Sequence, residues 1–231
     1  MARMVRGIVI LLWLCGLAVP RLAAAETYAP QLAALQSQLA ADPTNQTLLF
    51  KLGDLCFDEG AQDNHEAVKL AEKYFSKLLE LDPKNARALA LLGSTFTMKG
   101  RDALWPPTRM KLVREGIKKM DAAAALAPAD PGVRFTRAFN NFHMPKFMDR
   151  ESIVEADFEW LWAQLPSKPG ALDAEMKQNI AFCQGTLLKR KGQNSDALAV
   201  WQQGIAFDPF SPIAQKIQEQ MKKTKGHEKN K

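Results

Sequence analysis

The chain has 231 residues, of which 47% are hydrophobic and 24% are charged, so it can bury a core and is not a disordered chain. Gly and Pro number 13 each, which excludes collagen-like and low-complexity polymers. The formal charge of +6 lies mostly at the two ends, since residues 1–25 carry +3 and residues 216–231 carry +4, which leaves −1 for residues 26–215. A near-neutral body is not typical of a nucleic-acid-binding domain, so we expect no nucleic-acid partner.

Residues 1–25 have the order of a secretory signal. Two arginines precede an uncharged apolar run over residues 7–19, and a proline and a stretch of alanines follow it. A membrane-spanning helix needs about 20 apolar residues, so this run is short for an anchor. We therefore expect cleavage after Ala25 and a periplasmic or secreted chain that starts at Glu26. An uncleaved anchor is the alternative.

From there on, apolar residues recur at the three- and four-residue spacing of helices, and no long stretch alternates as a strand would. The pattern predicts a lone helix over 30–41, a series of helix pairs, and a capping helix over 210–222. Proline just beyond a helix is a stop signal. Such a proline separates the predicted helices at Asp42-Pro43, Asp82-Pro83, Ala127-Pro128 and Asp208-Pro209.

A repeating unit is clearest over residues 178–211. This segment of 34 residues carries Gly185, Ala197, Trp201 and Pro209 at the spacing of the pattern W-x₂-L-G-x₂-Y…A-x₃-F…P, and thus resembles the tetratricopeptide repeat. Two earlier units carry the same marks, with six and eleven extra residues between their helices, and the unit between them and the last is degenerate. The matching positions are Gly53, Ala71, Phe75 and Pro83, then Gly93, Gly116, Met120 and Pro128.

The resemblance implies an all-α, single-domain solenoid of about four helix-turn-helix repeats with flanking and capping helices over residues 26–222. A Lys-rich disordered tail over residues 223–231 is expected to follow. The structural interpretation of this tail is a solvated terminus without a binding role. The functional interpretation is attraction to anionic lipids or to an acidic partner.

Proteins of this family bind protein partners in a concave groove lined by the first helix of each repeat. Carried over position by position, the resemblance implies a groove for a protein or peptide lined by Phe50, Asp54, Arg87, Thr97, Phe135, Phe139, Phe142, His143, Phe182, Lys189 and Arg190. The triplet Phe135, Phe139 and Phe142 also has the spacing of a core stripe, so core and groove both stay open for it.

The extra residues of the second unit, Arg101–Lys111, contain Trp105 before two prolines. Insertions in repeats map to loops, often on the binding face. Trp105 is therefore expected either to contact the partner or to pack back over the helix ends.

Motifs of catalysis are missing from the sequence. It has no phosphate-binding or dinucleotide-binding glycine motif, no C-x-x-C and no G-x-S-x-G, and His65-Glu66 lacks a second histidine at position 69. We expect no cofactor, no metal and no catalytic residue. A pair of Cys183 and His143 from adjacent repeats is the one enzymatic alternative, although the apolar stripe around Cys183 favours an inert core thiol.

These observations favour a non-catalytic scaffold that binds another protein through its groove. The alternative is a small-molecule or lipid carrier that serves an envelope transport system, because a phenylalanine-rich lining would also suit a small apolar ligand. Membrane contact is expected only through the signal segment or the Lys-rich tail.

Overall fold

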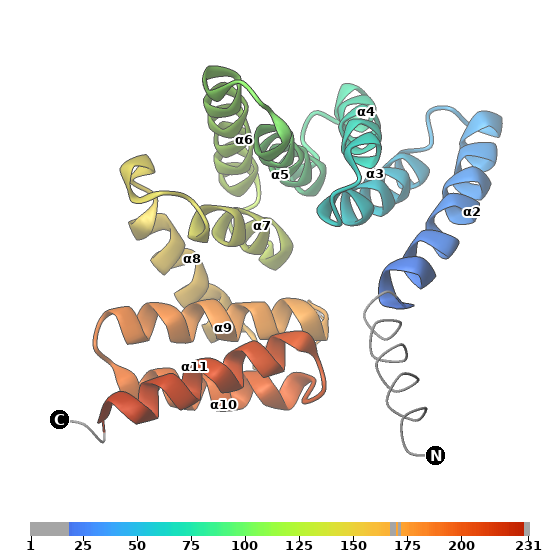
Figure 1. Cartoon of the computed structure of the whole chain (residues 1–231). Helices are drawn as coiled ribbons and strands as arrows, with labels where there is room; N and C mark the ends of the chain where they lie inside the picture. The colour runs from blue at the N-terminus through green and yellow to red at the C-terminus, as the bar shows by residue number, and fades with distance from the viewer. Residues whose placement is uncertain (1–18, 167–169, 171, 229–231) are drawn as a thin grey trace, which may run out of the picture. The chain divides into compact units, whose positions relative to one another are not determined.

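The computed structural model describes residues 19–166, 170 and 172–228, and this part of the chain is helical with no strand (Figure 1). The helices divide into two compact units, one ending at Pro83 and the other beginning at Lys84. The single repeat domain over residues 26–222 stays a prediction. Each unit buries its own apolar side chains and so has a core of its own.

The first unit consists of α2 (Val19–Ala41), α3 (Gln46–Ala61) and α4 (His65–Leu81). The hairpin of α3 and α4 encloses Leu52 and Phe75, neither of which is exposed. Helix α2 lies on this hairpin, where Gln36 Nε2 donates to the Tyr74 hydroxyl over 2.9 Å. The lone helix predicted over 30–41 begins earlier, at Val19, and Pro30 lies within it.

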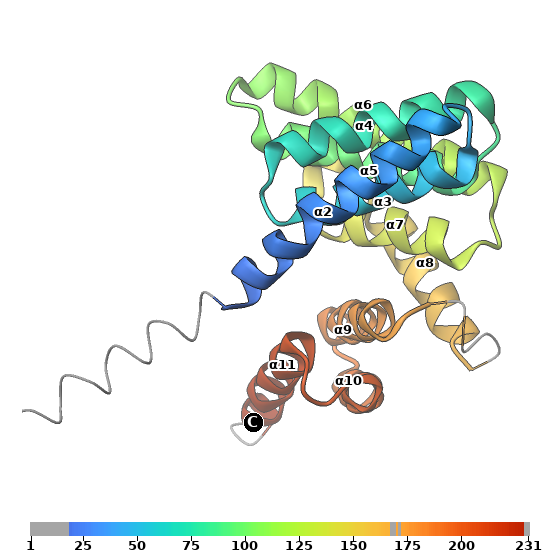
Figure 2. The same ribbon diagram turned by 90° about the vertical axis from the view of Figure 1, so that its right-hand side faces the viewer.

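The second unit contains three helix pairs and a capping helix, and Figure 2 shows the last pair together with that cap. The elements are α5 (Ala86–Asp102), α6 (Pro106–Leu126), α7 (Pro131–Phe142), the 3₁₀ turn η1 (Lys146–Met148), α8 (Glu151–Gln164), α9 (Ala174–Arg190), α10 (Asn194–Phe207) and α11 (Pro212–Glu228).

A four-residue turn starts most first helices of the pairs. The proline that stops one helix stands two positions before a polar residue whose side chain caps the next. Asn45 accepts from the Leu48 amide over 3.0 Å, and Asn85 accepts from the Ala88 amide over 3.1 Å. Asp130 and Ser211 have the same place before α7 and α11. An N-cap satisfies an amide that the helix leaves unpaired, so one short sequence pattern both ends and starts helices.

The extra residues of the first two repeats lengthen helices instead of forming loops. The turns at residues 62–64 and 103–105 have three residues each, as has the turn at 191–193 in the unit without extra residues. Most of the predicted insertion loop, Arg101–Lys111, is therefore helical, which corrects that prediction. Its prolines occupy the first turn of α6, where a missing amide hydrogen costs no helical bond.

Close backbone contact between α5 and α6 explains why the second repeat has glycine at both Gly93 and Gly116. A Cβ on Gly93 would lie 2.7 Å from the Gly116 carbonyl oxygen, and one on Gly116 would lie 2.5 Å from the Gly93 carbonyl oxygen. Both distances are too short for a carbon, so only glycine at both positions permits this packing.

The third pair is irregular, as its degenerate sequence predicts. Helix α7 ends at Phe142, and the chain makes an elbow through η1 before α8. Asp149 ends the elbow with a left-handed φ of 52°.

The predicted disordered tail over 223–231 is wrong for its first part, because α11 extends to Glu228. Its buried side chains continue the helical spacing from Ile217 through Met221 to Thr224, whose hydroxyl also donates to the Gln220 carbonyl over 2.8 Å. Residues 229–231 lie outside the described part, as do residues 1–18 of the predicted signal segment, whose last residues, 19–25, begin α2.

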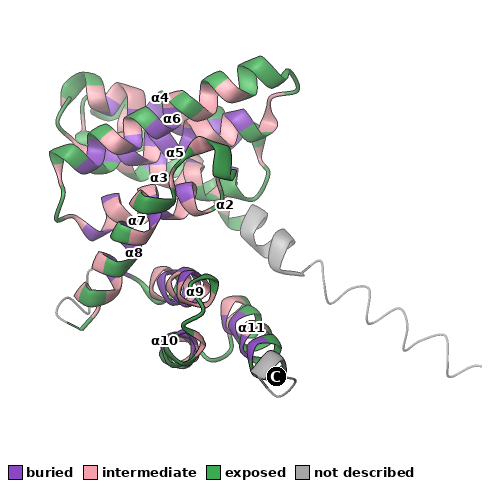
Figure 3. Cartoon of the chain, turned by 90° about the vertical axis from the view of Figure 1, so that its left-hand side faces the viewer, coloured by how far each residue is buried: buried purple, intermediate pink, exposed green. Residues whose placement is uncertain are grey.

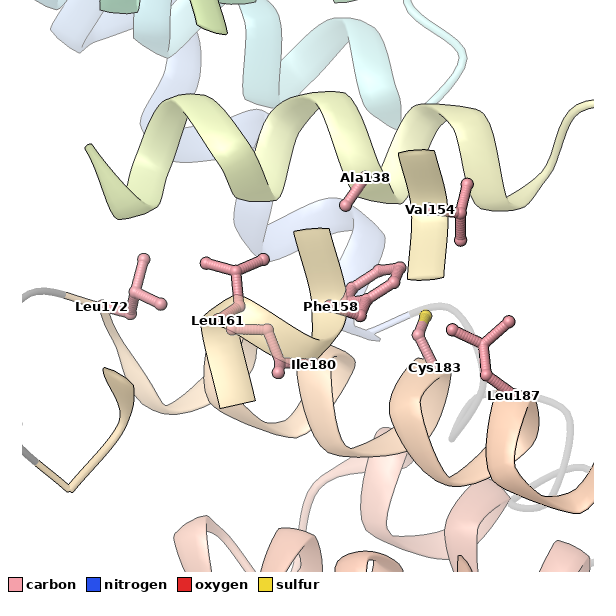
Figure 4. Packing of buried hydrophobic residues seen from close by; sticks show 8 residues of the cluster. All are labelled: Ala138, Val154, Phe158, Leu161, Leu172, Ile180, Cys183 and Leu187. Carbon is pink, nitrogen blue, oxygen red and sulfur yellow. The ribbon is translucent and has the colours of Figure 1, made fainter. Parts of the chain in front are cut away.

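The core that joins α7, α8 and α9 carries the candidate site. It is built from buried apolar side chains of all three helices and of Leu172, which precedes α9; Figure 4 shows Ala138, Val154, Phe158, Leu161, Leu172, Ile180, Cys183 and Leu187.

Candidate functional site

Several predicted groove residues lie on α7 and α9, which are in contact. Along α7, the rings of Phe135 and Phe139 stack with centroids 5.4 Å apart, and His143 meets Phe139 edge to face at 5.0 Å. The three positions are four residues apart, so they form one row on the helix. Phe182 of α9 packs against the same core. We define the α7–α9 surface as Phe135, Phe139, His143, Phe182, Lys189 and Arg190.

Arg190 lies at one end of this surface, with its guanidinium 5.1 Å from the centroid of the Phe142 ring. Phe142 in turn meets His143 edge to face at 5.3 Å and Phe158 at 5.9 Å. Partial burial and the charge of Arg190 hold the pKa of His143 below its ordinary value. His143 is therefore mainly neutral at pH 7, and Arg190 carries the positive charge at this end.

The choice between core and groove for Phe135, Phe139 and Phe142 has a mixed outcome. All three are partly buried and pack against the core of α7, α8 and α9, yet none is closed off from solvent. Lys189 is partly buried and Arg190 is exposed. The rings thus contribute to the core and remain partly accessible, and Arg190 lies beside the ring of Phe142.

Two other predicted groove residues bind other parts of the fold. Arg87 Nε donates to Asp130 Oδ2 over 2.8 Å, and Asp130 is the N-cap of α7. The Thr97 hydroxyl lies 2.7 Å from Asn140 Oδ1. These contacts tie α5 to α7, so Arg87 and Thr97 also have a structural role.

The groove residues predicted in the first repeat belong to the first unit. Phe50 is partly buried and meets Phe75 edge to face at 6.0 Å. Asp54 is also partly buried, and this burial raises the pKa of its carboxyl group. Both residues therefore belong to the first unit, whereas the α7–α9 surface belongs to the second.

Trp105 does not pack back over the helix ends. It is the N-cap residue of α6 and is 67% exposed. Its neighbour Leu104 is 96% exposed, so the turn between α5 and α6 presents two apolar side chains to solvent.

A buried ionic cluster beside the site was missed. Asp157 of α8 has no exposed surface and receives hydrogen bonds from Arg134 Nη1 over 2.9 Å and from Arg137 Nε over 2.8 Å. Arg150 extends the cluster to Asp121, with Nη2 and Oδ1 2.5 Å apart. The sequence contains an indication of this cluster. Two arginines stand on α7 at positions that this repeat family buries, and buried arginines need carboxylate partners.

The pair of Cys183 and His143 does not make a nucleophile. Cys183 is fully buried, and this burial raises the pKa of its thiol far above its ordinary value. A neutral, buried thiol is inert. Among the described residues, no group of three or more His, Cys, Asp and Glu side chains could hold a metal ion. In the same part of the chain, no helix is long and apolar enough to cross a membrane.

Two depressions, both open to solvent, border the site. One lies between α8 and α9 around the ion pair of Lys191 and Glu155, whose Nζ and Oε2 are 2.9 Å apart. The other lies under the elbow, where Phe142 and Arg190 of the α7–α9 region meet Asn141 and Lys146. The Asn141 side-chain nitrogen is buried there without a hydrogen-bond partner.

The comparisons with known proteins bear on the fold. No model of a known protein family and no curated protein matches the sequence. Among solved structures, TTC0263, a thermophilic TPR protein of Thermus thermophilus, is similar with a TM-score of 0.63 at 15% identity, over 88% of this chain and 93% of that one. The chain has the tetratricopeptide-repeat fold. A second similar structure, MamA, has a TM-score of 0.49 at 20% identity, over 80% of this chain and 91% of that one.

Proposed function

We propose that this tetratricopeptide-repeat protein is a non-catalytic scaffold of the periplasm or the extracellular space, which binds a segment of another protein along the α7–α9 surface. The observation that carries the proposal is the partly exposed row of Phe135, Phe139 and His143 along α7 and its C-cap, with Arg190 of α9 at one end.

The chemistry of this surface suits a peptide with apolar and acidic side chains. Aromatic rings and arginines are the residue types most enriched at binding hot spots, because they bury much area and hold their geometry. Phe139 offers a ring edge already fixed by its stacking on Phe135. Lys189 and Arg190 provide positive charge for a carboxylate of the partner.

The proposed compartment is inferred from the signal pattern of residues 1–25. The inert state of Cys183 supports the non-catalytic part of the proposal, since the one nucleophile considered is buried and neutral. The carrier alternative would be favoured by an enclosed apolar pocket. Both depressions described above are instead open to solvent, so they give it no support.

Native mass spectrometry of the protein recovered from its own host tests the proposal. We expect a complex with a second polypeptide and a chain that begins at Glu26. An excess of a few hundred daltons would favour the carrier instead, and a chain that begins at Met1 would contradict cleavage.

Charge reversal then tests the surface. Lys189→Glu and Arg190→Glu should each weaken binding of the captured partner by about tenfold, as for loss of one favourable charge contact. Lys222→Glu, an exposed residue of α11, makes the same change of charge elsewhere in the unit and should bind as the wild type does. Equal binding by all three variants would place the partner on another surface.

A further inference from the structure

The turn between α5 and α6 is the most exposed apolar feature of the second unit. Leu104 and Trp105 are 96% and 67% exposed, respectively, and Figure 3 draws the turn in the colour of exposed residues. Exposure of two large apolar side chains to water is unfavourable, so the turn is a candidate site of contact with another molecule.

Two hydrogen bonds of Arg109 hold this turn. Arg109 Nη2 donates to the Ala103 carbonyl over 2.9 Å, and the Arg109 amide donates to the Trp105 carbonyl over 3.0 Å. Two prolines follow as the first residues of α6, and their rings restrict the backbone. These hydrogen bonds and prolines restrict the backbone that carries Leu104 and Trp105.

The positive charge of the body is concentrated in a segment that contains this turn, the end of α5 and the first two thirds of α6. Residues 99–119 carry seven basic and two acidic side chains, a net charge of +5, whereas the rest of residues 84–215 has eleven of each sign. The basic residues are Lys99, Arg101, Arg109, Lys111, Arg114, Lys118 and Lys119, and the acidic ones are Asp102 and Glu115. The body is near neutral as a whole only because the first unit is acidic.

We propose that this tip, meaning Leu104, Trp105 and the basic residues of 99–119, inserts into the headgroup layer of an anionic lipid bilayer. Tryptophan is enriched at the boundary of lipid and water, where its ring is apolar and its N–H remains hydrated. Lysines and arginines near the surface are attracted to anionic headgroups, and their long stems keep the charges in the polar layer.

A bilayer fits better than an acidic protein because the tip projects. A rigid protein partner would need a matching pocket for Leu104 and Trp105, as hot-spot residues fill pockets. A fluid headgroup layer closes around a projection of any shape. The proposal adds a third membrane contact to the two that the sequence predicted, and it does not depend on the α7–α9 surface.

Quenching of Trp105 by brominated lipids tests the insertion. The protein, as its host processes it, is titrated with brominated phosphatidylcholine vesicles with and without phosphatidylglycerol. The signal is the difference in quenching between the wild type and Trp105→Phe. This subtraction cancels the quenching of the other tryptophans and any contribution of residues 7–19 to binding. We expect quenching of Trp105 by the anionic vesicles only.

Variants separate the two parts of the tip. Leu104→Ser should reduce the quenching, and Lys111→Gln and Arg114→Gln should each raise the lipid concentration at half-quenching roughly fivefold, the equivalent of ~1 kcal/mol per charge. Phe210→Ser is the matched control, because Phe210 is 92% exposed in a turn, residues 208–211, that contains no basic residue, and the substitution should leave the quenching unchanged.

Three results would overturn the proposal. Trp105 could remain unquenched by anionic vesicles, it could be quenched equally by zwitterionic ones, or Phe210→Ser could abolish the signal as Leu104→Ser does. If Trp105 is unquenched and the tip variants instead lose capture of an acidic protein, the tip is a protein contact.

Discussion

The indole of Trp201 lies directly on the backbone of Gly185, in the space that a side chain at position 185 would occupy. Its Nε1 donates to the Phe182 carbonyl of the same helix as Gly185 over 3.2 Å, so this hydrogen bond holds the ring against α9. Trp201 is fully buried, and it links α9 to the core beneath α11. The repeat pattern pairs these two positions because a large ring on one helix needs a residue without a side chain on the other.

Gly185→Ala is therefore expected to destabilise the second unit. A methyl group would overlap the indole, and overpacking of this kind costs about 1–3 kcal/mol. Urea unfolding should show the loss. Gly170→Ala is the control, because no heavy atom lies within 4 Å of where its Cβ would be. An equal effect of the two substitutions would mean that the indole moves aside without cost.

Asp157→Asn tests the buried ionic cluster. Asp157 balances both Arg134 and Arg137, so the amide would leave the Arg134 guanidinium without this carboxylate and Arg137 with only the more distant one of Asp121, 3.7 Å away. Breaking a buried pair in this way costs about 3–5 kcal/mol. Asp196→Asn, at an exposed position of α10, should stay within about 0.5 kcal/mol of the wild type in the same unfolding experiment. A small loss for Asp157→Asn would show that water reaches the arginines.

The fold could be predicted from local signals. The prolines that stop helices and the polar caps that follow act within four residues, so the sequence alone places most helix ends. Asn85 and Asp130 show this, since each caps the helix that the preceding proline predicts. The same signals were too weak for the end of α11, where only the buried spacing of Met221 and Thr224 extends the helix.

The candidate site could be predicted only in part, because it depends on contacts between distant residues. The pairing of Arg134 with Asp157 joins residues 23 positions apart, and that of Arg87 with Asp130 joins residues 43 positions apart. Repeat position alone placed Arg87 in the groove, and it could not show that a cap of another helix would take the guanidinium. The row of Phe135 and Phe139 was found because helical spacing is local.

Acid should weaken the cap that Asp130 makes. Burial opposes ionisation of this carboxyl, but hydrogen bonds from Arg87 and from the amides of Val133 and Gly132 outweigh it, so its pKa lies below the ordinary value of 3.8. A lowered pKa in the folded state means that the stabilisation is fully present above about pH 4 and is lost as the pH falls through the folded-state pKa.

Asp130→Ala should cost about 1–2 kcal/mol at pH 7, the usual value of an N-cap, and the difference from the wild type should shrink as the pH falls below 3.8. Asp130→Asn is the matched variant, because asparagine caps as well but carries no charge. The difference between Asn and Ala should not change with pH, and if it did, another group would be titrating. Unfolding by denaturant at each pH measures all three chains.

Both described cysteines should resist alkylation in the folded protein. Burial raises the pKa of the Cys183 thiol well above its ordinary value, and burial also raises that of Cys56, which receives a hydrogen bond from the Tyr28 hydroxyl over 3.6 Å. Because only the thiolate reacts, iodoacetamide at pH 8 should label neither residue until denaturant is added. Peptide mass spectrometry identifies each site. His143→Ala should leave the rate at Cys183 unchanged, since no ion pair activates this thiol. Rapid native labelling of Cys183 that His143→Ala abolishes would instead restore the enzymatic alternative, because it would require a thiolate held by the imidazole.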